Sequence, residues 1–267
     1  MRWLRRFVEL KPRPAADATS PAARMSAADA AAARGDYEEA LTLWGPIAKA
    51  GLPGAQRNIG ICFAQGLGVE FDLKLAVRWF ALAAEADDPV GQRHLADMYF
   101  KGEGVDQDYA RAGALYRRAA EAGDAPAQDM LSWMSLEGEV MPPDYAEAHK
   151  WALAAAEQGI AASMTRLGMI YHNALGVERD PKAAAVWWRK GAELGDPDAQ
   201  AMLGAAYHLA AGVPRDRVTA LALLLGARAQ RSALAETFVR AARAELSPEE
   251  IAEATRRSAD PLREAAR

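Results

Sequence analysis

The chain has 267 residues, of which 51% are hydrophobic and 25% are charged, so it has the composition of a folded protein and not of a disordered one. Its 32 basic and 36 acidic residues are unevenly placed, because residues 1–13 hold five basic residues and one acid while the acidic excess lies in the body of the chain. An acidic body offers no basic stripe for phosphate contacts, so we expect no nucleic acid among the partners.

Residues 1–20 are predicted to form a basic arm and linker ahead of the folded domain. In a short helix the large apolar side chains of this arm would share one side. They are Trp3, Leu4, Phe7 and Val8. Residues 1–13 could therefore make weak contact with an anionic membrane, dock on the folded domain or stay without fixed structure. No stretch approaches the roughly 18 apolar residues that span a bilayer, and no signal-peptide pattern follows. We expect a cytoplasmic protein, peripheral at the inner membrane if the arm binds lipid.

A period of 36 residues runs through the chain without an insertion. One column of equivalent positions is aspartate throughout, and it contains Asp72, Asp108, Asp144, Asp180 and Asp216. Another column, four residues earlier in each unit, contains Gly68, Gly104, Val140, Gly176 and Gly212. A fixed period of this length over five units is typical of a solenoid made of helix pairs.

Each column predicts a local structure. The glycines supply a tight turn between two helices, and the aspartate that follows caps the second helix. Within that helix Ala76, Phe80 and Ala84 recur at helical spacing as a buried stripe. We expect one column of large side chains to fill the space between units. Its members are Trp79, Leu115, Trp151, Trp187 and Leu223.

These columns resemble the Sel-1-like repeat family, a branch of the tetratricopeptide-type α-solenoids, over roughly residues 36–231. The segments that carry the resemblance are "QGLGVEFDLKLAVRWFALAAEA", "KGEGVDQDYARAGALYRRAAEAGDAPAQ" and "NALGVERDPKAAAVWWRKGAELGDPDAQ". The resemblance implies an all-α, right-handed solenoid of about six helix-turn-helix units over residues 21–245. It also implies a C-terminal cap over residues 246–267, where "LSPEEIAEA" is typical of a capping box from Ser247 to Glu250, as in many bacterial members.

No motif for catalysis or cofactor binding is present, so we predict no catalytic residue and no cofactor. His172 and His208 occupy one column and could approach the same ion, but no further ligand accompanies them, and we predict no metal site. The single cysteine, Cys62, lies where other units carry Met or Ile, and we expect it in the core.

The first helix of each unit is the predicted binding surface. If Ala55, Ile59 and Phe63 mark its buried side, the opposite side presents one set of residues through the later units. The predicted partner-binding residues are Arg93, Asp97, Phe100, Lys101, Asp129, Trp133, Leu136, Met169, His172 and His208. In related solenoids the first helices line the concave side, so we predict a groove for a peptide or helix, centred on Trp133. The alternative is that these residues pack between units or under the cap.

The leading hypothesis for function is a non-enzymatic adaptor or scaffold that binds a protein or peptide partner. The resemblance also offers β-lactam binding or hydrolysis, which is associated with cysteine-rich relatives. Those relatives depend on disulfide-stapled repeats, and a chain with one cysteine cannot form them. A third hypothesis is a peripheral membrane organiser that uses residues 1–13.

Overall fold

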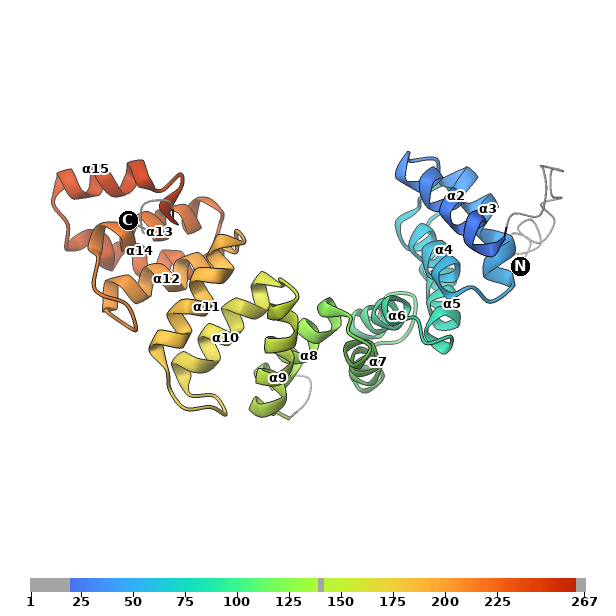
Figure 1. The fold of residues 1–267 in the computed structure, drawn as a ribbon, viewed down its shortest axis with the longest axis horizontal. Coiled ribbons are helices and arrows are strands. Elements are labelled where there is room, and N and C mark those ends of the chain that lie inside the picture. The colour runs from blue at the N-terminus through green and yellow to red at the C-terminus, as the bar shows by residue number, and fades with distance from the viewer. Residues whose placement is uncertain (1–19, 139–141, 263–267) are drawn as a thin grey trace. The chain divides into compact units, whose positions relative to one another are not determined.

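The computed structural model describes residues 20–138 and 142–262, and this part of the chain forms 14 α-helices in consecutive antiparallel pairs (Figure 1). The first helices of the pairs are α2 (Pro21–Ala33), α4 (Pro53–Gln65), α6 (Pro89–Lys101), α8 (Ala125–Glu137), α10 (Ala161–Asn173), α12 (Pro197–Leu209) and α14 (Ala233–Ala244). The second helices are α3 (Tyr37–Lys49), α5 (Leu73–Glu85), α7 (Tyr109–Glu121), α9 (Tyr145–Glu157), α11 (Pro181–Glu193) and α13 (Arg217–Ala229), and α15 (Pro248–Arg257) packs on α13. The predicted all-α solenoid is confirmed. The predictions for residues 1–13 lie outside the described residues.

The chain divides into two compact units. Unit 1 is Met1–Ala127 and unit 2 is Gln128–Arg267, with the boundary inside α8. From α2 to α7 and from α9 to α14, each helix contacts the next helix along the chain. In the part of the chain that the structure describes, no helix is both long enough and apolar enough to cross a bilayer.

Aspartates begin the second helices, as predicted. Asp72, Asp108, Asp144 and Asp216 each accept a hydrogen bond from the backbone N–H three residues later, at 2.9–3.0 Å. Asp180 accepts two such bonds, from Lys182 and Ala183. The side chains thus satisfy backbone donors that a helix leaves unpaired at its start.

The second glycine of each loop has a further role that the sequence did not predict. Gly104 has φ +72°, and a Cβ added there would lie 2.6 Å from the carbonyl carbon and oxygen of Leu73, the first residue of α5 in the preceding pair. Gly176 approaches Tyr145 in the same way. The absence of a side chain therefore lets one loop touch the start of the preceding second helix, besides permitting a left-handed turn.

The column predicted to fill the space between units is buried at Trp151 and Leu223 and only partly buried at Trp79, Leu115 and Trp187, whereas the residue one position later is buried in every unit. Trp187 is partly exposed, with the Lys190 ammonium 4.2 Å from its ring, and the prediction that it is buried is wrong. Trp188 is 1% exposed, lies over Gly168 and donates its Nε1–H to the carbonyl oxygen of Thr165 at 3.2 Å. The predicted burial of Trp151 is confirmed. The large ring of the second helix therefore faces a position of the first helix that must be small.

The same arrangement recurs in both units, with the small partner on the first helix. The buried column on the second helices is Phe80, Tyr116, Ala152, Trp188 and Leu224. The facing column is Gly60, Ala96, Ser132, Gly168 and Gly204. Where the second-helix residue is Ala152, the facing residue can be the larger Ser132. The pairing of large with small is what a close-packed interior requires.

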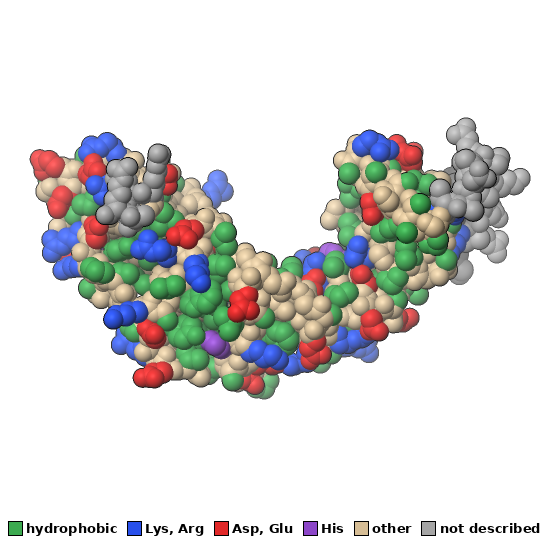
Figure 2. Space-filling model, in the orientation of Figure 1, with side chains coloured by type: hydrophobic (Ala, Val, Ile, Leu, Met, Phe, Trp, Pro, Cys, Tyr) green, Lys and Arg blue, Asp and Glu red, His purple; other side chains and the backbone are tan. Residues whose placement is uncertain are grey.

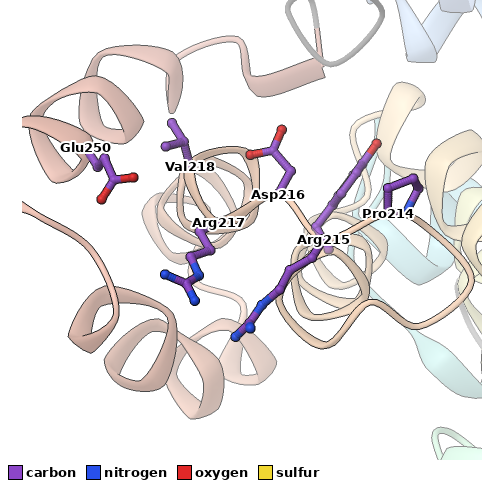
Figure 3. A pocket seen from close by; sticks show the side chains of 7 residues that line it. Pro214, Arg215, Asp216, Arg217, Val218 and Glu250 are labelled. Carbon is purple, nitrogen blue, oxygen red and sulfur yellow. The ribbon is translucent and has the colours of Figure 1, made fainter.

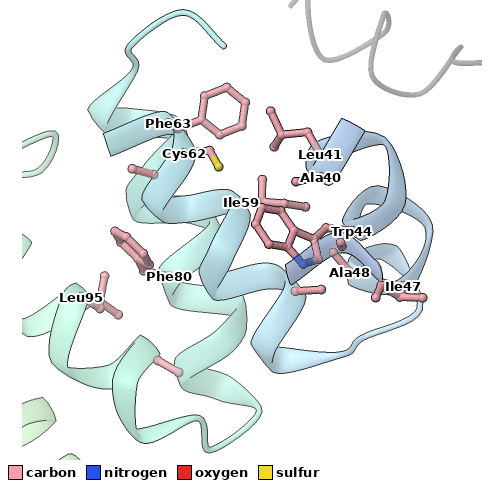
Figure 4. Packing of buried hydrophobic residues seen from close by; sticks show 14 of the residues in the cluster. Ala40, Leu41, Trp44, Ile47, Ala48, Ile59, Cys62, Phe63, Phe80 and Leu95 are labelled. Carbon is pink, nitrogen blue, oxygen red and sulfur yellow. The ribbon is translucent and has the colours of Figure 1, made fainter. Parts of the chain in front are cut away.

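The core of unit 1 shows the packing directly (Figure 4). Ile59, Phe63 and Trp44 meet between α4 and α3, and Phe80 lies on the other side of α4. Cys62 is 1% exposed within this cluster, which confirms its predicted place in the core. Burial without a charged partner raises the pKa of its thiol to about 11.

The C-terminal helix begins with the predicted capping box. The Ser247 hydroxyl accepts from the backbone N–H of Glu250 at 3.2 Å, and the Glu250 carboxylate accepts from the backbone N–H of Ser247 at 2.8 Å. Ala254 of α15 is fully buried against the core beside α13 and α14. The helix therefore covers apolar surface that the last repeat would otherwise expose.

Candidate partner-binding face

An apolar strip runs over four successive first helices of unit 2. Its members are apolar and partly exposed, and they occupy three neighbouring repeat positions, one shared by Met130, Met202 and Phe238 and another by Trp133 and Met169. They are Met130 and Trp133 of α8, Met169 of α10, Met202 of α12, and Leu234 and Phe238 of α14. Met202 packs on the core cluster around Trp188, and Leu234 and Phe238 pack on the cluster around Leu221. The strip is therefore the solvent-facing edge of the core, held in place from beneath.

The strip is bordered by more acid than base. Arg166 of α10 is paired with Asp129 of α8 at 2.6 Å, and the Ser163 hydroxyl donates to the same carboxylate at 2.5 Å. Asp198 accepts a hydrogen bond from the Ser232 hydroxyl at 2.6 Å, and Glu137 is exposed at the end of α8. Three carboxylates thus border the strip against one guanidinium.

The equivalent positions of unit 1 present a mixed polar surface. Asn58 and Ile61 of α4 and Val90, His94 and Asp97 of α6 are all partly exposed there. Three of the five are polar or ionisable. The same repeat positions of unit 2 carry the apolar strip, and their charged members are Arg166 and Asp198. The two units therefore offer different chemistry from the same repeat positions.

In unit 1 a ladder of ion pairs links successive first helices to the caps that follow. Arg57 is paired with Asp88 at 3.1 Å, and Arg93 with Asp124 at 2.9 Å. Asp88 and Asp124 also cap α6 and α8 through the backbone N–H groups of Gly91 and Ala127. In unit 2 a hydrogen bond replaces the ion pair at this position, because the Thr165 hydroxyl donates to the Asp196 carboxylate at 2.9 Å. These ion pairs join neighbouring repeats, so the four charged groups already have partners within the chain.

A cluster of titratable groups surrounds Asp97. The Tyr116 hydroxyl donates to Asp97 at 2.5 Å, and His94 Nδ1 lies 3.8 Å from the same carboxylate. Burial raises the pKa of Asp97 and, together with the adjacent carboxylate, raises that of Tyr116. His94 stacks on Phe80 with ring centroids 5.0 Å apart, and burial, with the charges of Arg93 and Arg57, lowers its pKa to about 4. At neutral pH this cluster holds a neutral imidazole.

The predicted binding residues divide into two groups. Trp133 and Met169 lie on the strip, and Lys101 is exposed at the end of α6. Arg93 and Asp129 are partly buried in the ion pairs described above, and Asp97 is bonded to Tyr116. Whether a partner touches any of these residues stays a prediction.

One predicted column packs toward the second helices and the core, and three of its members, Phe100, Leu136 and His172, remain partly exposed. Phe100 packs edge-on against Tyr109 at 5.3 Å, and Leu136 packs on the core cluster around Leu167. His172 lies 5.5 Å from the ring of Trp188. His208 is 7% exposed, so its prediction as a surface residue is wrong.

The displacement has a physical cause. The buried arc of α4 contains Gln56 and Gly60 as well as Ala55, Ile59 and Phe63, because Gly60 receives the ring of Phe80. That wider arc shifts the solvent-facing side toward Asn58 and Ile61. Sequence reasoning therefore missed Met130, Met202, Leu234 and Phe238. The signal that could have found them is the column of residues 58, 94, 130, 166, 202 and 238, which turns from polar to mainly apolar along the chain.

Other exposed apolar residues do not form a repeated surface. Figure 2 shows hydrophobic side chains gathered over α10 and α11 of unit 2, where Val186 and Leu194 are 52% and 56% exposed. The positions equivalent to Val186 carry Arg78, Ala114 and Lys150. Exposed apolar side chains that do not recur from repeat to repeat are ordinary on protein surfaces.

A cavity of about 620 Å³ lies where the last repeat meets the C-terminal helix, beside Tyr207, Pro214 and Val218 (Figure 3). The side chains of Arg215 and Arg217 extend to the same side of the loop, and both pair with Glu245, at 2.6 and 3.4 Å. Glu250, also in the wall, belongs to the capping box. The two arginines thus join the loop before α13 and the first residue of that helix to the end of α14. Within the described residues, no three His, Cys, Asp or Glu side chains are grouped as ligands for a metal ion.

Comparison with known proteins identifies the repeat. The model of the Sel1 repeat matches residues 53–88, 89–124, 125–160, 161–196 and 197–230. The chain belongs to the Sel1 repeat family. The helix pairs, glycine loops and aspartate caps described above are therefore those of Sel1 repeats.

One solved structure agrees with this assignment, and two further ones are similar at lower sequence identity. A Sel1 repeat protein from Oxalobacter formigenes is 32% identical, with 76% of this chain and 84% of that chain covered and a TM-score of 0.72. A protective antigen of uropathogenic Escherichia coli with an SLR fold is 24% identical, covering 91% and 69% of the two chains at a TM-score of 0.38. An immunity protein from Pseudomonas aeruginosa is 18% identical, covering 95% and 86% at a TM-score of 0.47. A search of curated proteins returns no match.

Proposed function

We propose that this Sel1-repeat solenoid is a non-enzymatic adaptor that binds a protein partner on its first helices. The observation that carries the proposal is the strip of partly exposed Met, Trp, Leu and Phe side chains on α8, α10, α12 and α14. Solenoids commonly use such extended surfaces for binding, since every repeat contributes equivalent positions. Methionine and aromatic side chains adapt to a partner's shape and are favoured at binding surfaces.

The polar residues around the first helices support binding more than catalysis. Arg93, Asp97 and Asp129 are each engaged with a side chain of a neighbouring helix, and each contact has a structural role. Their geometry is that of a fixed frame around a surface. An adaptor needs such rigidity, because a partner that meets an ordered surface loses less entropy on binding.

Site-specific photo-crosslinking in the native cell tests the proposal. A photoreactive phenylalanine analogue at Met169 should give a discrete protein adduct, since this position lies on the strip. The matched control is the same analogue at Val186, which is exposed on the second helix α11. Equal crosslinking at the two positions, or none at Met169, contradicts the proposal.

A further inference from the structure

We infer that the strip of unit 2 binds a basic amphipathic α-helix, with large apolar side chains two turns apart and Lys or Arg at its flanks. This inference rests on the proposed function and names the partner's chemistry. It is drawn from three features of unit 2, namely the apolar strip, the spacing of the helices that carry it and the charges along its border.

The first feature is the composition of the strip. Met130, Met169 and Met202 lie on three successive first helices, and Trp133 and Phe238 are the aromatic members of the strip. Apolar helix faces commonly bind in grooves of this composition. Unbranched methionine side chains can rearrange around different apolar anchors without a large loss of packing.

The second feature is the spacing between anchors. Packed helices lie about 8–10 Å apart, so equivalent positions on neighbouring first helices, such as Trp133 and Met169 or Met202 and Phe238, are separated by about that distance. Two turns of an α-helix advance about 10.5 Å over seven residues and return the side chain to the same face. An extended peptide covers the distance in about three residues, and an odd number of steps turns alternate side chains away from the strip. The spacing therefore favours a helix with pairs of apolar anchors seven residues apart.

The third feature is the charge along the border. Asp129, Glu137 and Asp198 lie beside the strip, and Arg166 is the cation paired with Asp129. Two carboxylates, Glu137 and Asp198, thus remain in excess. A partner with Lys or Arg outside its apolar face gains from them in rate and orientation of docking. The same carboxylates oppose adsorption to an anionic membrane, which attracts basic surfaces.

A selection experiment tests the inference on the full chain. Random 20-residue peptides displayed on phage are selected against the wild-type protein, and the enriched peptides are synthesised with a fluorescent label. Affinities are then measured by fluorescence anisotropy. We expect enriched peptides with a net positive charge and apolar residues at helical spacing, and we expect circular dichroism to show helix formation on binding.

Two pairs of variants locate the binding site. Met169→Ser should weaken the selected peptides at least tenfold, while the control Val186→Ser, on the exposed second helix, should change the affinity less than twofold. Glu137→Gln should weaken basic peptides three- to tenfold and reduce their salt dependence. The control Glu193→Gln removes an exposed acid at the end of α11 and should have no such effect.

The outcomes separate the inference from the proposed function. Acidic or non-helical peptides that still depend on Met169 would overturn the helix inference and leave a protein-binding strip in place. Peptides that bind Met169→Ser as tightly as the wild type would overturn the inference and count against the strip as the adaptor surface. Failure to enrich any peptide would also overturn the inference.

Discussion

Units 1 and 2 use the same 36-residue repeat for different surfaces. Both have aspartate caps, glycine loops and large side chains set against small ones. The first helices of unit 1 carry the paired Arg57 and Arg93 with His94 and Asp97 between them, whereas those of unit 2 carry methionine and aromatic side chains. The comparison teaches that the repeat prescribes the contacts between helices and leaves the solvent-facing columns free to differ.

The largest expected effect comes from removing the large buried side chain that faces a glycine, and it tests whether this packing stabilises both units equally. Trp188→Ala in unit 2 and Phe80→Ala in unit 1 should each lower the free energy of unfolding by about 3–5 kcal/mol, because both leave a cavity opposite a glycine. Trp187→Ala should cost only about 1 kcal/mol, since its ring is partly exposed. Urea denaturation followed by circular dichroism measures all three. A Trp187 variant as unstable as the Trp188 variant would contradict the core assigned here.

A smaller effect distinguishes the ionic ladder of unit 1 from its neutral counterpart in unit 2. Arg93→Ala leaves the buried Asp124 carboxylate with its backbone hydrogen bond but without a cation, and it should cost about 2–3 kcal/mol. Thr165→Ala removes one hydrogen bond to Asp196 and should cost about 1 kcal/mol. The same denaturation measurement applies. Equal costs would show that the charge of the unit 1 ladder contributes nothing beyond a hydrogen bond.

The cluster around Asp97 should make the stability of unit 1 depend on pH. The pKa of His94 is lowered to about 4, so between that pH and about 6.5 the unfolded chain binds more protons than the folded one. Stability is therefore lost as the pH falls through this window, by about 2 kcal/mol at pH 5 relative to pH 7. The raised pKa of Asp97 acts in the opposite direction, because the folded state then binds a proton more readily.

His94→Gln provides the check. The variant should show a loss of stability between pH 7 and pH 5 that is smaller than that of the wild type by about the same 2 kcal/mol. Denaturation at the two pH values measures it. If wild type and variant lose the same free energy of unfolding between pH 7 and pH 5, the pKa of His94 is not lowered in the folded protein.

The smallest expected effect transfers a contact from unit 2 to unit 1. In unit 2 the buried amides of Gln128 and Gln200 accept hydrogen bonds from Gln158 and Gln230, at 2.8 and 2.9 Å. The equivalent Oε1 of Gln92 in unit 1 is buried without a hydrogen-bond partner, and Ala122 occupies the position of the donor. Ala122→Gln should supply that donor and raise stability by about 1 kcal/mol.

A matched variant makes the gain specific. Ala122→Glu has a similar size but offers only acceptor oxygens at neutral pH, so it should give no increase. Thermal or urea denaturation compares the two. Equal stabilisation by Gln and Glu would mean that the gain comes from something other than the contact to Gln92.

The helix caps and turns could be predicted from the sequence because they recur every 36 residues and their residue types have few structural roles. An aspartate before a helix and a glycine after one have few alternative roles, and Asp72 and Gly66 occupy those places. The binding face was less predictable. Its position depends on how widely each first helix is buried, and that width is set by the ring of Phe80 against Gly60, which a helical wheel does not contain. The predicted buried arc was too narrow, so the predicted face included Leu136 and His208 and left out Met130 and Met202.

The division between Trp187 and Trp188 could not be predicted for a related reason. Adjacent tryptophans both satisfy an apolar pattern, and only the glycine on the facing helix decides which ring enters. Gly168 and Trp188 are 20 residues apart in the sequence, as are Gly60 and Phe80. Their relation becomes visible once the contact is known.

The glycine loops have a consequence for recognition. Because Gly104 and Gly176 let a loop rest directly on the first residue of the preceding second helix, the backbone itself sets the separation of consecutive helix pairs. In unit 2, Gly176 therefore helps to fix how far apart α8 and α10 stand, and with them Trp133 and Met169. Glycines that do not face the strip thus set the spacing between the strip residues. A lineage of such proteins can thus exchange the apolar residues it displays while their spacing stays constant.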